Sequence, residues 1–213
     1  MVLIRKLKTR WLQILTHVAA LLPLALLAWG YWQGRLIDPV QEITTRTGRT
    51  ALILLILSLA CTPLNIMFGF KQIMRVRRTL GLYAFMYAGL HFLTFVGLDY
   101  GFDFDLLGQG ILDQRYVLVG FAAGLLLLLL AITSTQGWQK RLRKNWKRLH
   151  RLVYLAGVLA IVHFVWLAKD NREPLRYGAV VALLLIVRIP AVKRAISNTR
   201  HRLKTRCKTT REV

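Results

Sequence analysis

Two histidines, His91 and His163, lie deep inside separate apolar segments, at nearly equal distances from a basic boundary. His91 comes thirteen residues after Arg78, and His163 comes twelve residues after Arg151. At a rise of about 1.5 Å per helical residue, both side chains would lie about 18–20 Å into a bilayer from the same side. An imidazole at that depth is costly without a partner. Two of them at one level could bind one metal ion between them, so the spacing favours a metal centre shared by two helices over two core histidines satisfied by hydrogen bonds.

Histidine is a good ligand for haem iron, and a haem held by two imidazoles has no open coordination position. Such a centre suits electron transfer rather than oxygen binding. Alanines precede each histidine by three and seven residues, and these offsets place them on the histidine's own helix face. They are Ala88 and Ala84 before His91, and Ala160 and Ala156 before His163. These small residues would either leave room for a porphyrin or let helices pack closely.

Three further histidines have more than one interpretation. His150 begins the apolar segment that carries His163, about 20 Å lower along a helix. It would serve a second, inner haem, or it is an ordinary histidine at the membrane interface. His17, about 10 Å deep in the first apolar segment, could be its partner or could pack against a neighbouring helix. His201, in a basic tail, is expected to be solvated.

The elements that must position these histidines are apolar helices. The chain has 213 residues, of which 55% are hydrophobic, and its apolar stretches approach the length that crosses a bilayer. We therefore expect an all-α membrane protein with a six-helix transmembrane bundle. The predicted spans are Trp11–Trp32, Thr50–Phe70, Leu80–Leu98, Tyr116–Thr135, Leu149–Leu167 and Leu175–Ile189. In the last span, Arg176 and Arg188 would snorkel to the two interfaces. The expected organisation is a cytoplasmic N-terminus (1–10), a haem-binding six-span domain (11–190) and a basic cytoplasmic tail (191–213).

The distribution of charge supports this topology. Of the 31 Lys and Arg residues, 24 fall in the four segments on one side of the predicted membrane, and 8 of the 9 acids fall on the other. Basic loops face the cytoplasm, so both termini are expected there. The net charge of +22 then reflects topology and contact with anionic headgroups rather than nucleic-acid binding. Arginines near the span ends could bind haem carboxylates or lipid headgroups: Arg49 and Arg115 on the outer side, and Arg77, Arg78 and Arg151 on the inner side.

Several shorter patterns add local predictions. Thr47-Gly48-Arg49-Thr50 is typical of a turn and helix cap at the start of the second span. Gly120 and Gly124 form G-x-x-x-G, which favours close helix packing over a ligand role. Thr133-Ser134-Thr135 predicts hydrogen bonds at a helix end. No internal repeat stands out. Cys61 and Cys207 are separated by the topology, so we expect no disulfide.

No nucleotide-binding motif occurs in the sequence, and we find no soluble catalytic domain and no removable signal peptide. Any chemistry is therefore expected inside the helix bundle or in a partner protein.

These residues together resemble the MsrQ (formerly YedZ) family of haem-binding membrane subunits of the bacterial periplasmic methionine-sulfoxide reductase system. The family belongs to the ferric-reductase-like transmembrane group. The resemblance runs from His17 to about Arg188. It is carried by HVAALLP (17–23), DPV (38–40), TGRTAL (47–52), TPL (62–64), RRTLGL (77–82), Leu90-His91, TST (133–135), WKRLHRLVY (146–154), His163 and Trp166.

The resemblance implies one or two b-type haems between spans three and five, with His91, His150 and His163 as ligands. His150 and His163 match the thirteen-residue spacing of the group. Span three departs from it, because Arg78 stands thirteen residues before His91, so His17 or a non-histidine ligand would complete the inner site. A second departure is Gln114-Arg115-Tyr116, where the family has Arg-Pro-Tyr. The family is also associated with FMN.

The implied role is electron transfer across the bacterial inner membrane. Electrons would come from membrane quinol or a cytosolic flavin reductase and pass to a periplasmic molybdopterin-containing methionine-sulfoxide reductase, which carries out the catalysis. One alternative is a small proton-coupled transporter, which the absence of carboxylates from the middles of the spans argues against. Another is a non-redox anchor that recruits its partner through the loops Asp38–Arg49 and Asp99–Arg115.

Overall fold

The computed structural model describes residues 2–196, with side chains from residue 11 onward. The predicted end of the tail, including His201 and Cys207, lies outside the described residues. The described residues form helices and no strand, so the all-α prediction is confirmed. The elements are α1 (Val2–Trp32), α2 (Pro39–Phe68), the short 3-10 helix η1 (Lys71–Arg75), α3 (Arg77–Thr94), the π-helical turn η2 (Phe95–Asp99), α4 (Phe104–Asp113), α5 (Arg115–Ile132), α6 (Gln136–Leu149), α7 (Leu152–Leu167) and α8 (Arg172–Ile186).

Four helical stretches are long and apolar enough to cross a membrane, judged by length and composition. They are Trp11–Trp32 of α1, α2, α3 continued through η2, and α5. Helices α6 and α7 meet at a 52° bend and count as a fifth if they are one broken span. Helix α8 corresponds to the sixth predicted span but has only 15 residues, so the sixth crossing stays a prediction.

Helix α2 begins eleven residues before the predicted span, at Pro39. Asp38 caps it, since its carboxylate accepts a hydrogen bond of 3.0 Å from the backbone N–H of Gln41. Pro39 fits the first turn because its missing N–H would have no helical partner there. The predicted cap at Thr47–Thr50 is therefore wrong, because these residues lie inside the helix. Gly69 ends α2 in the left-handed conformation, at a φ of 73°.

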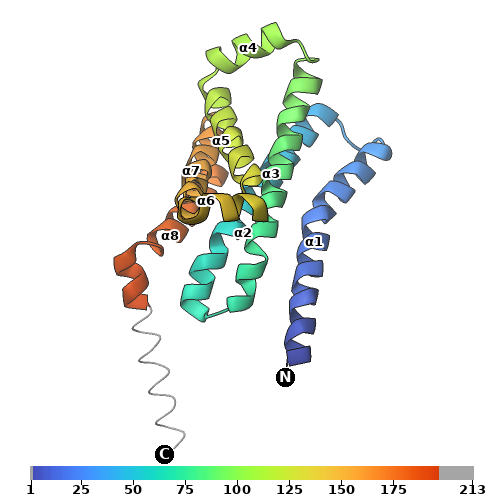
Figure 1. Cartoon of the computed structure of the whole chain (residues 1–213). Helices are drawn as coiled ribbons and strands as arrows, with labels where there is room; N and C mark the ends of the chain where they lie inside the picture. Colours follow the sequence, from blue (N-terminus) through green and yellow to red (C-terminus); the bar gives the residue numbers. More distant parts are fainter. Residues whose placement is uncertain (1, 197–213) are drawn as a thin grey trace, which may run out of the picture.

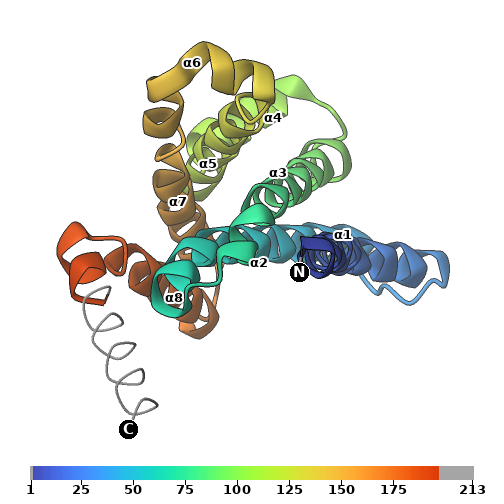
Figure 2. The ribbon, with the colours of Figure 1, turned by 60° about the horizontal axis from the view of Figure 1, so that its bottom comes forward.

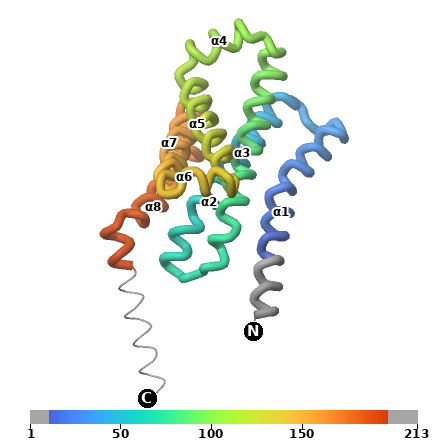
Figure 3. Tube along the Cα trace, in the orientation of Figure 1, coloured from blue at the N-terminus to red at the C-terminus, as the bar shows by residue number. Residues whose placement is uncertain are grey.

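The helices form two antiparallel pairs that pack side by side. Helix α2 packs along α3, and α5 packs along α7. Figure 1 shows α3 and α5 upright beside each other, with α4 bridging their ends at one edge of the bundle. Figure 2 shows α1 on the opposite side of the bundle from α6 and α7, and the trace in Figure 3 follows the same order. The space between α3 and α7 is therefore enclosed by four helices.

Two helices lie in segments that the sequence analysis treated as loops. Helix α4 follows Asp103, whose carboxylate accepts hydrogen bonds from two backbone N–H groups. Helix α6 is kinked at Arg143, where φ is 46°, and it carries Leu142, Trp146 and Leu149 as partly buried residues among exposed Lys and Arg. This pattern is typical of a helix lying in the membrane interface. Figure 1 shows α6 running across the bundle rather than along it.

The core joins five helices. Its buried residues come from α1, α2, α3, α5 and α7, and they are Ala20, Ala51, Leu54, Leu55, Ala84, Tyr87, Leu127 and Ala156. Tyr87 is the largest of them and is 1% exposed. Its hydroxyl donates to the carbonyl of Ala20 at 2.7 Å and accepts from the N–H of Leu24 at 3.0 Å. This side chain therefore fastens α1 to α3, although α1 otherwise presents mostly exposed apolar residues.

Tyr87→Phe should loosen this attachment, because it removes the hydroxyl that binds the α1 backbone. We expect the free energy of unfolding to fall by about 1 kcal/mol, which is typical of one interhelical hydrogen bond. Thermal unfolding of the purified protein in detergent measures the change. Tyr83→Phe, on the same helix but bonded to the exposed His17, is the control. An equal loss in both variants would contradict the role given to Tyr87.

Candidate functional site

The structure brings His91 of α3 and His163 of α7 together. Their ring centroids lie 6.2 Å apart, and the ring planes meet at 80°. Both side chains are partly buried within the bundle. The prediction that two helices bring histidines to one level is therefore confirmed in its geometry.

Each imidazole is fixed by a backbone carbonyl on the helix behind it. His91 Nδ1 lies 2.9 Å from the carbonyl oxygen of Thr44 in α2. His163 Nδ1 lies 2.7 Å from the carbonyl oxygen of Tyr116 in α5. A carbonyl can only accept, so Nδ1 must carry the proton in both rings. In the neutral imidazole, the lone pair is then on Nε2, the nitrogen left for a ligand.

A glycine makes room for each of these contacts. Gly48 stands four residues after Thr44, and a Cβ on it would lie 3.0 Å from His91 Nδ1. Gly120 stands four residues after Tyr116, and a Cβ on it would lie 2.6 Å from His163 Nδ1. Real Cβ atoms do not approach so closely at Gly120, so any side chain there would displace the imidazole. By contrast, a Cβ on Gly124 would meet nothing within 4 Å. The predicted close helix packing at G-x-x-x-G is therefore wrong. Gly120 instead leaves the space that the imidazole of His163 occupies.

The two halves of the site repeat one unit. Each unit is a carbonyl, a glycine four residues later and a histidine 47 residues after the carbonyl. The first runs through α2 and α3 and the second through α5 and α7. Their members are Thr44, Gly48 and His91 in the first, and Tyr116, Gly120 and His163 in the second. This repeat does not stand out in the sequence, because the two halves share only a backbone atom, a glycine and one side chain.

The donor set fits a metal that takes two axial imidazoles. An imidazole nitrogen binds first-row metals at about 2.0–2.1 Å, so one metal between two rings puts their centroids about 6 Å apart once the ring radius is added at each end. The observed 6.2 Å meets this requirement. Within the described residues, no group of three or more His, Cys, Asp or Glu could hold a bare metal ion. The pair therefore suits a metal whose remaining ligands come from a macrocycle, as in haem.

The alanines near the histidines lie in the protein core. Ala84 and Ala156 are fully buried and belong to the same core cluster. They pack against neighbouring helices, which is the second of the two roles predicted for these small residues. These two alanines lie about two helical turns from the histidines, in the core below the site.

His150 does not lie on the helix that carries His163. Helix α6 ends at Leu149 and α7 begins at Leu152, so His150 occupies the bend between them. The prediction that it begins the same helix is therefore wrong. Its ring packs on Trp146 with centroids 4.0 Å apart, and its Nε2 lies 3.3 Å from Thr133 Oγ1.

Thr133 and Ser134 organise the inner end of this region. Thr133 Oγ1 donates to the carbonyl of Leu129 at 2.7 Å, so the predicted helix-end hydrogen bond is confirmed. Its own carbonyl accepts from Trp146 Nε1 at 2.8 Å. Ser134 Oγ accepts from Arg78 Nε at 3.0 Å. Arg78 and His150, which each stand thirteen residues before a histidine of the pair, therefore bind adjacent residues of one buried corner.

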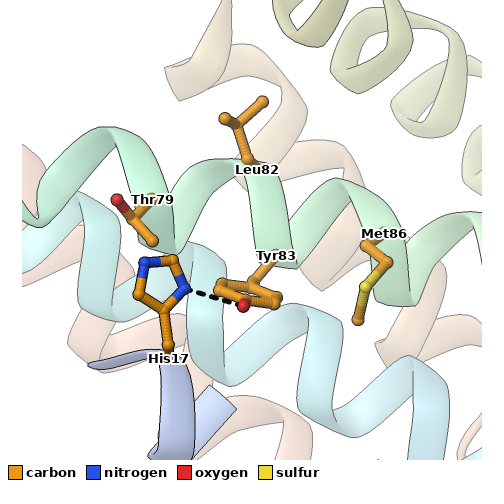
Figure 4. Close-up of a pocket in the computed structure, with 5 residues that line it drawn as sticks. All are labelled: His17, Thr79, Leu82, Tyr83 and Met86. Carbon is orange, nitrogen blue, oxygen red and sulfur yellow. Dashed lines mark hydrogen bonds between the residues drawn. The ribbon is translucent and has the colours of Figure 1, made fainter. Parts of the chain in front are cut away.

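His17 lies in a different place. Its Nδ1 is 2.8 Å from the hydroxyl of Tyr83, so it sits between α1 and α3. Figure 4 shows this contact. Thr79 lies on the His17 side of Tyr83, and Met86 lies on its other side. The residues border a cavity of about 330 Å³. Figure 2 places α1 away from α6 and α7, so the structure does not bring His17 and His150 together.

The two outer arginines that were proposed to bind haem carboxylates lie in different surroundings. Arg49 pairs with Glu173 of α8 at 2.8 Å, and both side chains are nearly half exposed. Arg115 begins α5, immediately before Tyr116. Arg49 therefore ties α2 to α8 at the outer end of the bundle.

The fold and the histidine pair define a multi-pass helical membrane protein with a two-histidine site between antiparallel helix pairs. Residues 47–161 match the family described as "Ferric reductase like transmembrane component". This range contains His91 and His150, whereas His163 follows it by two residues. No solved structure gave a significant match to the chain.

Curated relatives extend the match over most of the chain. A protein of Xanthomonas axonopodis pv. citri is 50% identical over 179 residues, covering 80% of this chain and 82% of its own. A protein of Xanthomonas campestris pv. campestris is 49% identical over 177 residues, covering 79% and 81%. A protein of Rhodospirillum rubrum is 43% identical over 186 residues, covering 85% and 89%. Each is named a protein-methionine-sulfoxide reductase heme-binding subunit, MsrQ. The chain belongs to the MsrQ family, which confirms the resemblance seen in its sequence.

Gly120→Ala should displace the His163 ring, because the added Cβ would overlap Nδ1. We expect a loss of about 1–3 kcal/mol in the free energy of unfolding, typical of overpacking in a well-packed interior. Gly124→Ala, one helical turn away on α5, is the matched control and should be neutral or stabilising by up to about 1 kcal/mol. Thermal unfolding gives the stability, and NMR of ¹⁵N-histidine-labelled protein follows the Nδ1 proton. Equal effects of the two alanines would rule out the close contact.

Proposed function

We propose that the chain is the electron-transfer subunit of a methionine-sulfoxide reductase system of the bacterial inner membrane. It takes electrons from membrane quinol or a cytosolic flavin reductase and delivers them to a periplasmic, molybdopterin-containing reductase that repairs oxidised proteins. The observation that carries the proposal is the pair of imidazoles on α3 and α7, whose ring centroids lie 6.2 Å apart, a spacing that suits one metal between them. The printed names of the relatives support haem as the group and methionine-sulfoxide reduction as the reaction served.

His91 and His163 are the proposed axial ligands of an outer b-type haem. Each keeps its proton on Nδ1 for a carbonyl and presents Nε2 to the iron. When bound, haem supplies a carrier that accepts and releases one electron at a time. Two tightly held imidazoles leave no open position, so they exclude oxygen and favour electron transfer. The backbone carbonyls cannot move without shifting α2 and α5, so they restrict movement of the rings during oxidation and reduction.

We also propose a second haem, near His150. His150 would provide one ligand, and its Nε2 now contacts only the hydroxyl of Thr133 at 3.3 Å. Arg78 is next to it in the same corner and can bind a carboxylate of the cofactor. The family resemblance also implies FMN, which stays part of the proposal without an assigned site.

The proposed topology has six crossings, with both termini in the cytoplasm. It rests on the basic segments that share one side and on the acids that share the other. The His91–His163 pair then lies in the outer half of the membrane, toward the acceptor. Acidic loops around α4 are the proposed contact surface for the periplasmic partner.

The purified protein, expressed with ample haem, should show the absorption spectrum of low-spin b-type haem. His91→Ala and His163→Ala should each lose the same haem, because each removes one of two ligands of one iron. Thr94→Ala, one turn beyond His91 on α3, is the control and should keep the full haem content. A colourless wild-type protein would favour the non-redox alternatives. A transporter would then show flux that depends on pH, and an anchor would support partner activity without its histidines.

His17→Ala tests the other role considered for this residue. We expect unchanged haem content and a slightly lower melting temperature, because Nδ1 binds Tyr83 between α1 and α3. His150→Ala, compared in the same haem-to-protein assay, should remove only the inner haem. Loss of a haem in His17→Ala would instead make His17 a ligand of the inner site.

A further inference from the structure

Arg188 turns into the protein just after α8 ends. The sequence predicts that it snorkels to the interface, and the structure adds specific partners for its guanidinium. Its Nη1 donates to the hydroxyl of Tyr154 in α7 at 2.5 Å, and its Nη2 donates to the carbonyl of Leu59 in α2 at 2.5 Å. The guanidinium carbon lies 4.7 Å from the centroid of the Tyr154 ring, in a cation–π contact. Arg188 therefore fastens the end of α8 to α2 and α7.

These partners leave the arginine incompletely satisfied. Its Nε is buried and has no hydrogen-bond partner among the described residues. Both Nη contacts are to neutral oxygen atoms, and no carboxylate among residues 11–196 forms a salt bridge with Arg188. A buried charge without a counter-ion and with an unused donor is costly. A structure that keeps such a group usually supplies an anion from elsewhere.

A cavity of about 200 Å³ lies beside Arg188, and two more cations border it. Arg77, at the start of α3, donates to Thr62 Oγ1 at 3.3 Å. Lys193, in the helical segment after α8, is exposed at the cavity's edge. Tyr154 and Thr62 add hydroxyl groups to the lining. Three cations and two hydroxyls therefore converge on one small space from four parts of the chain.

No carboxylate among residues 2–196 is placed to neutralise these cations. The acids fall at the starts of α2 and α8, and in the connections that join α3 to α5 and α7 to α8. The cavity is at the opposite ends of the same helices, where α2 and α8 finish and α3 and α7 begin. Both salt bridges of the described residues lie at the acidic end. The anion that matches the cavity must come from outside the described part of the chain.

We propose that this cavity is a binding site for a phosphate group, carried by a phospholipid headgroup or by a soluble phosphate ester. Arginine provides paired N–H donors that match phosphate oxygens, and lysine adds a mobile charge at the entrance. The guanidinium of Arg188 and the side chains of Arg77 and Lys193 border the same cavity and supply its positive charge. The site lies on the basic side of the protein, where the predicted topology places anionic headgroups. It is separate from the histidine pair and does not depend on the proposed electron-transfer function.

Thermal unfolding of the delipidated, haem-loaded protein in detergent tests the site. One arm titrates inorganic phosphate at constant ionic strength. The other adds mixed micelles with phosphatidylglycerol, compared with phosphatidylcholine. We expect a saturable rise in melting temperature in at least one arm. A response to phosphatidylglycerol alone makes the headgroup the source, whereas a response to inorganic phosphate admits soluble esters.

Substitutions of the cavity residues test whether the rise in melting temperature comes from this site. Arg188→Gln should raise the half-saturating concentration at least about tenfold, the effect of losing one charge-assisted contact. Lys193→Gln, an exposed change that leaves the fold intact, should raise it several-fold and covers the case in which Arg188→Gln does not fold. Arg194→Gln is the matched control, because Arg194 bonds only to the carbonyl of Pro190 in its own turn.

Two outcomes would overturn the site. One is a melting temperature that neither phosphate nor phosphatidylglycerol raises. The other is an equal loss of response in the Arg188, Lys193 and Arg194 variants, which would mean general attraction to a basic surface. Haem content, measured in the same samples, should be unchanged in all three variants.

Discussion

The hydrogen bond from an imidazole Nδ1 to a helix carbonyl is the constraint on which the rest of this structure depends. A histidine inside the membrane must satisfy its N–H, and a carbonyl already used by a helix can still accept a second bond. Such a bond requires the imidazole to approach the helix backbone closely. Gly48 and Gly120 allow that approach, each on the helix behind its histidine. The bond therefore adds a specific contact to each helix pair, between α2 and α3 and between α5 and α7.

The same hydrogen bond determines which ring nitrogen each histidine can offer to a ligand. Once Nδ1 is committed to a carbonyl, the neutral ring can offer only Nε2 to a ligand. Two such rings, with their centroids 6.2 Å apart, would offer two nitrogen donors to one metal. The opposite end of the same bundle, predicted to face the cytoplasm, is built differently. Thr133, Ser134, Arg78 and His150 form a corner of hydroxyls and cations there. One end of the bundle thus suits two imidazoles that bind one metal, whereas the other end is rich in positive charge and hydrogen-bond donors.

Sequence reasoning reached the histidine pair because depth in an apolar segment is readable from residue counts. It could not reach the carbonyls of Thr44 and Tyr116, because every residue has a carbonyl and its partner is set only by tertiary packing. Gly48 was misread as part of a helix cap, and Gly120 as a packing motif, because a glycine does not reveal what approaches it. The stronger start signal, Asp38-Pro39, was in the sequence all along.

Two further differences have local causes. The break at His150 separates an amphipathic helix from an apolar one, and the stripe of Leu142, Trp146 and Leu149 could have revealed it. Arg188 was expected in the interface because charge is costly in a membrane. The structure adds hydrogen bonds from its guanidinium to the hydroxyl of Tyr154 and the carbonyl of Leu59, which only tertiary contact could reveal. The overall all-α architecture followed from hydropathy, whereas the length of α8 left the sixth crossing open.

The central claim is that His91 and His163 hold one iron from opposite sides, with their ring planes near the 80° seen here. Electron paramagnetic resonance of the oxidised, haem-loaded protein tests this most directly. Nearly perpendicular axial imidazoles predict a strongly anisotropic low-spin ferric signal with one large g value, and His163→Ala should abolish it. A wild-type spectrum without this large-g signal, or the same large-g signal after the loss of either histidine, would contradict the claim.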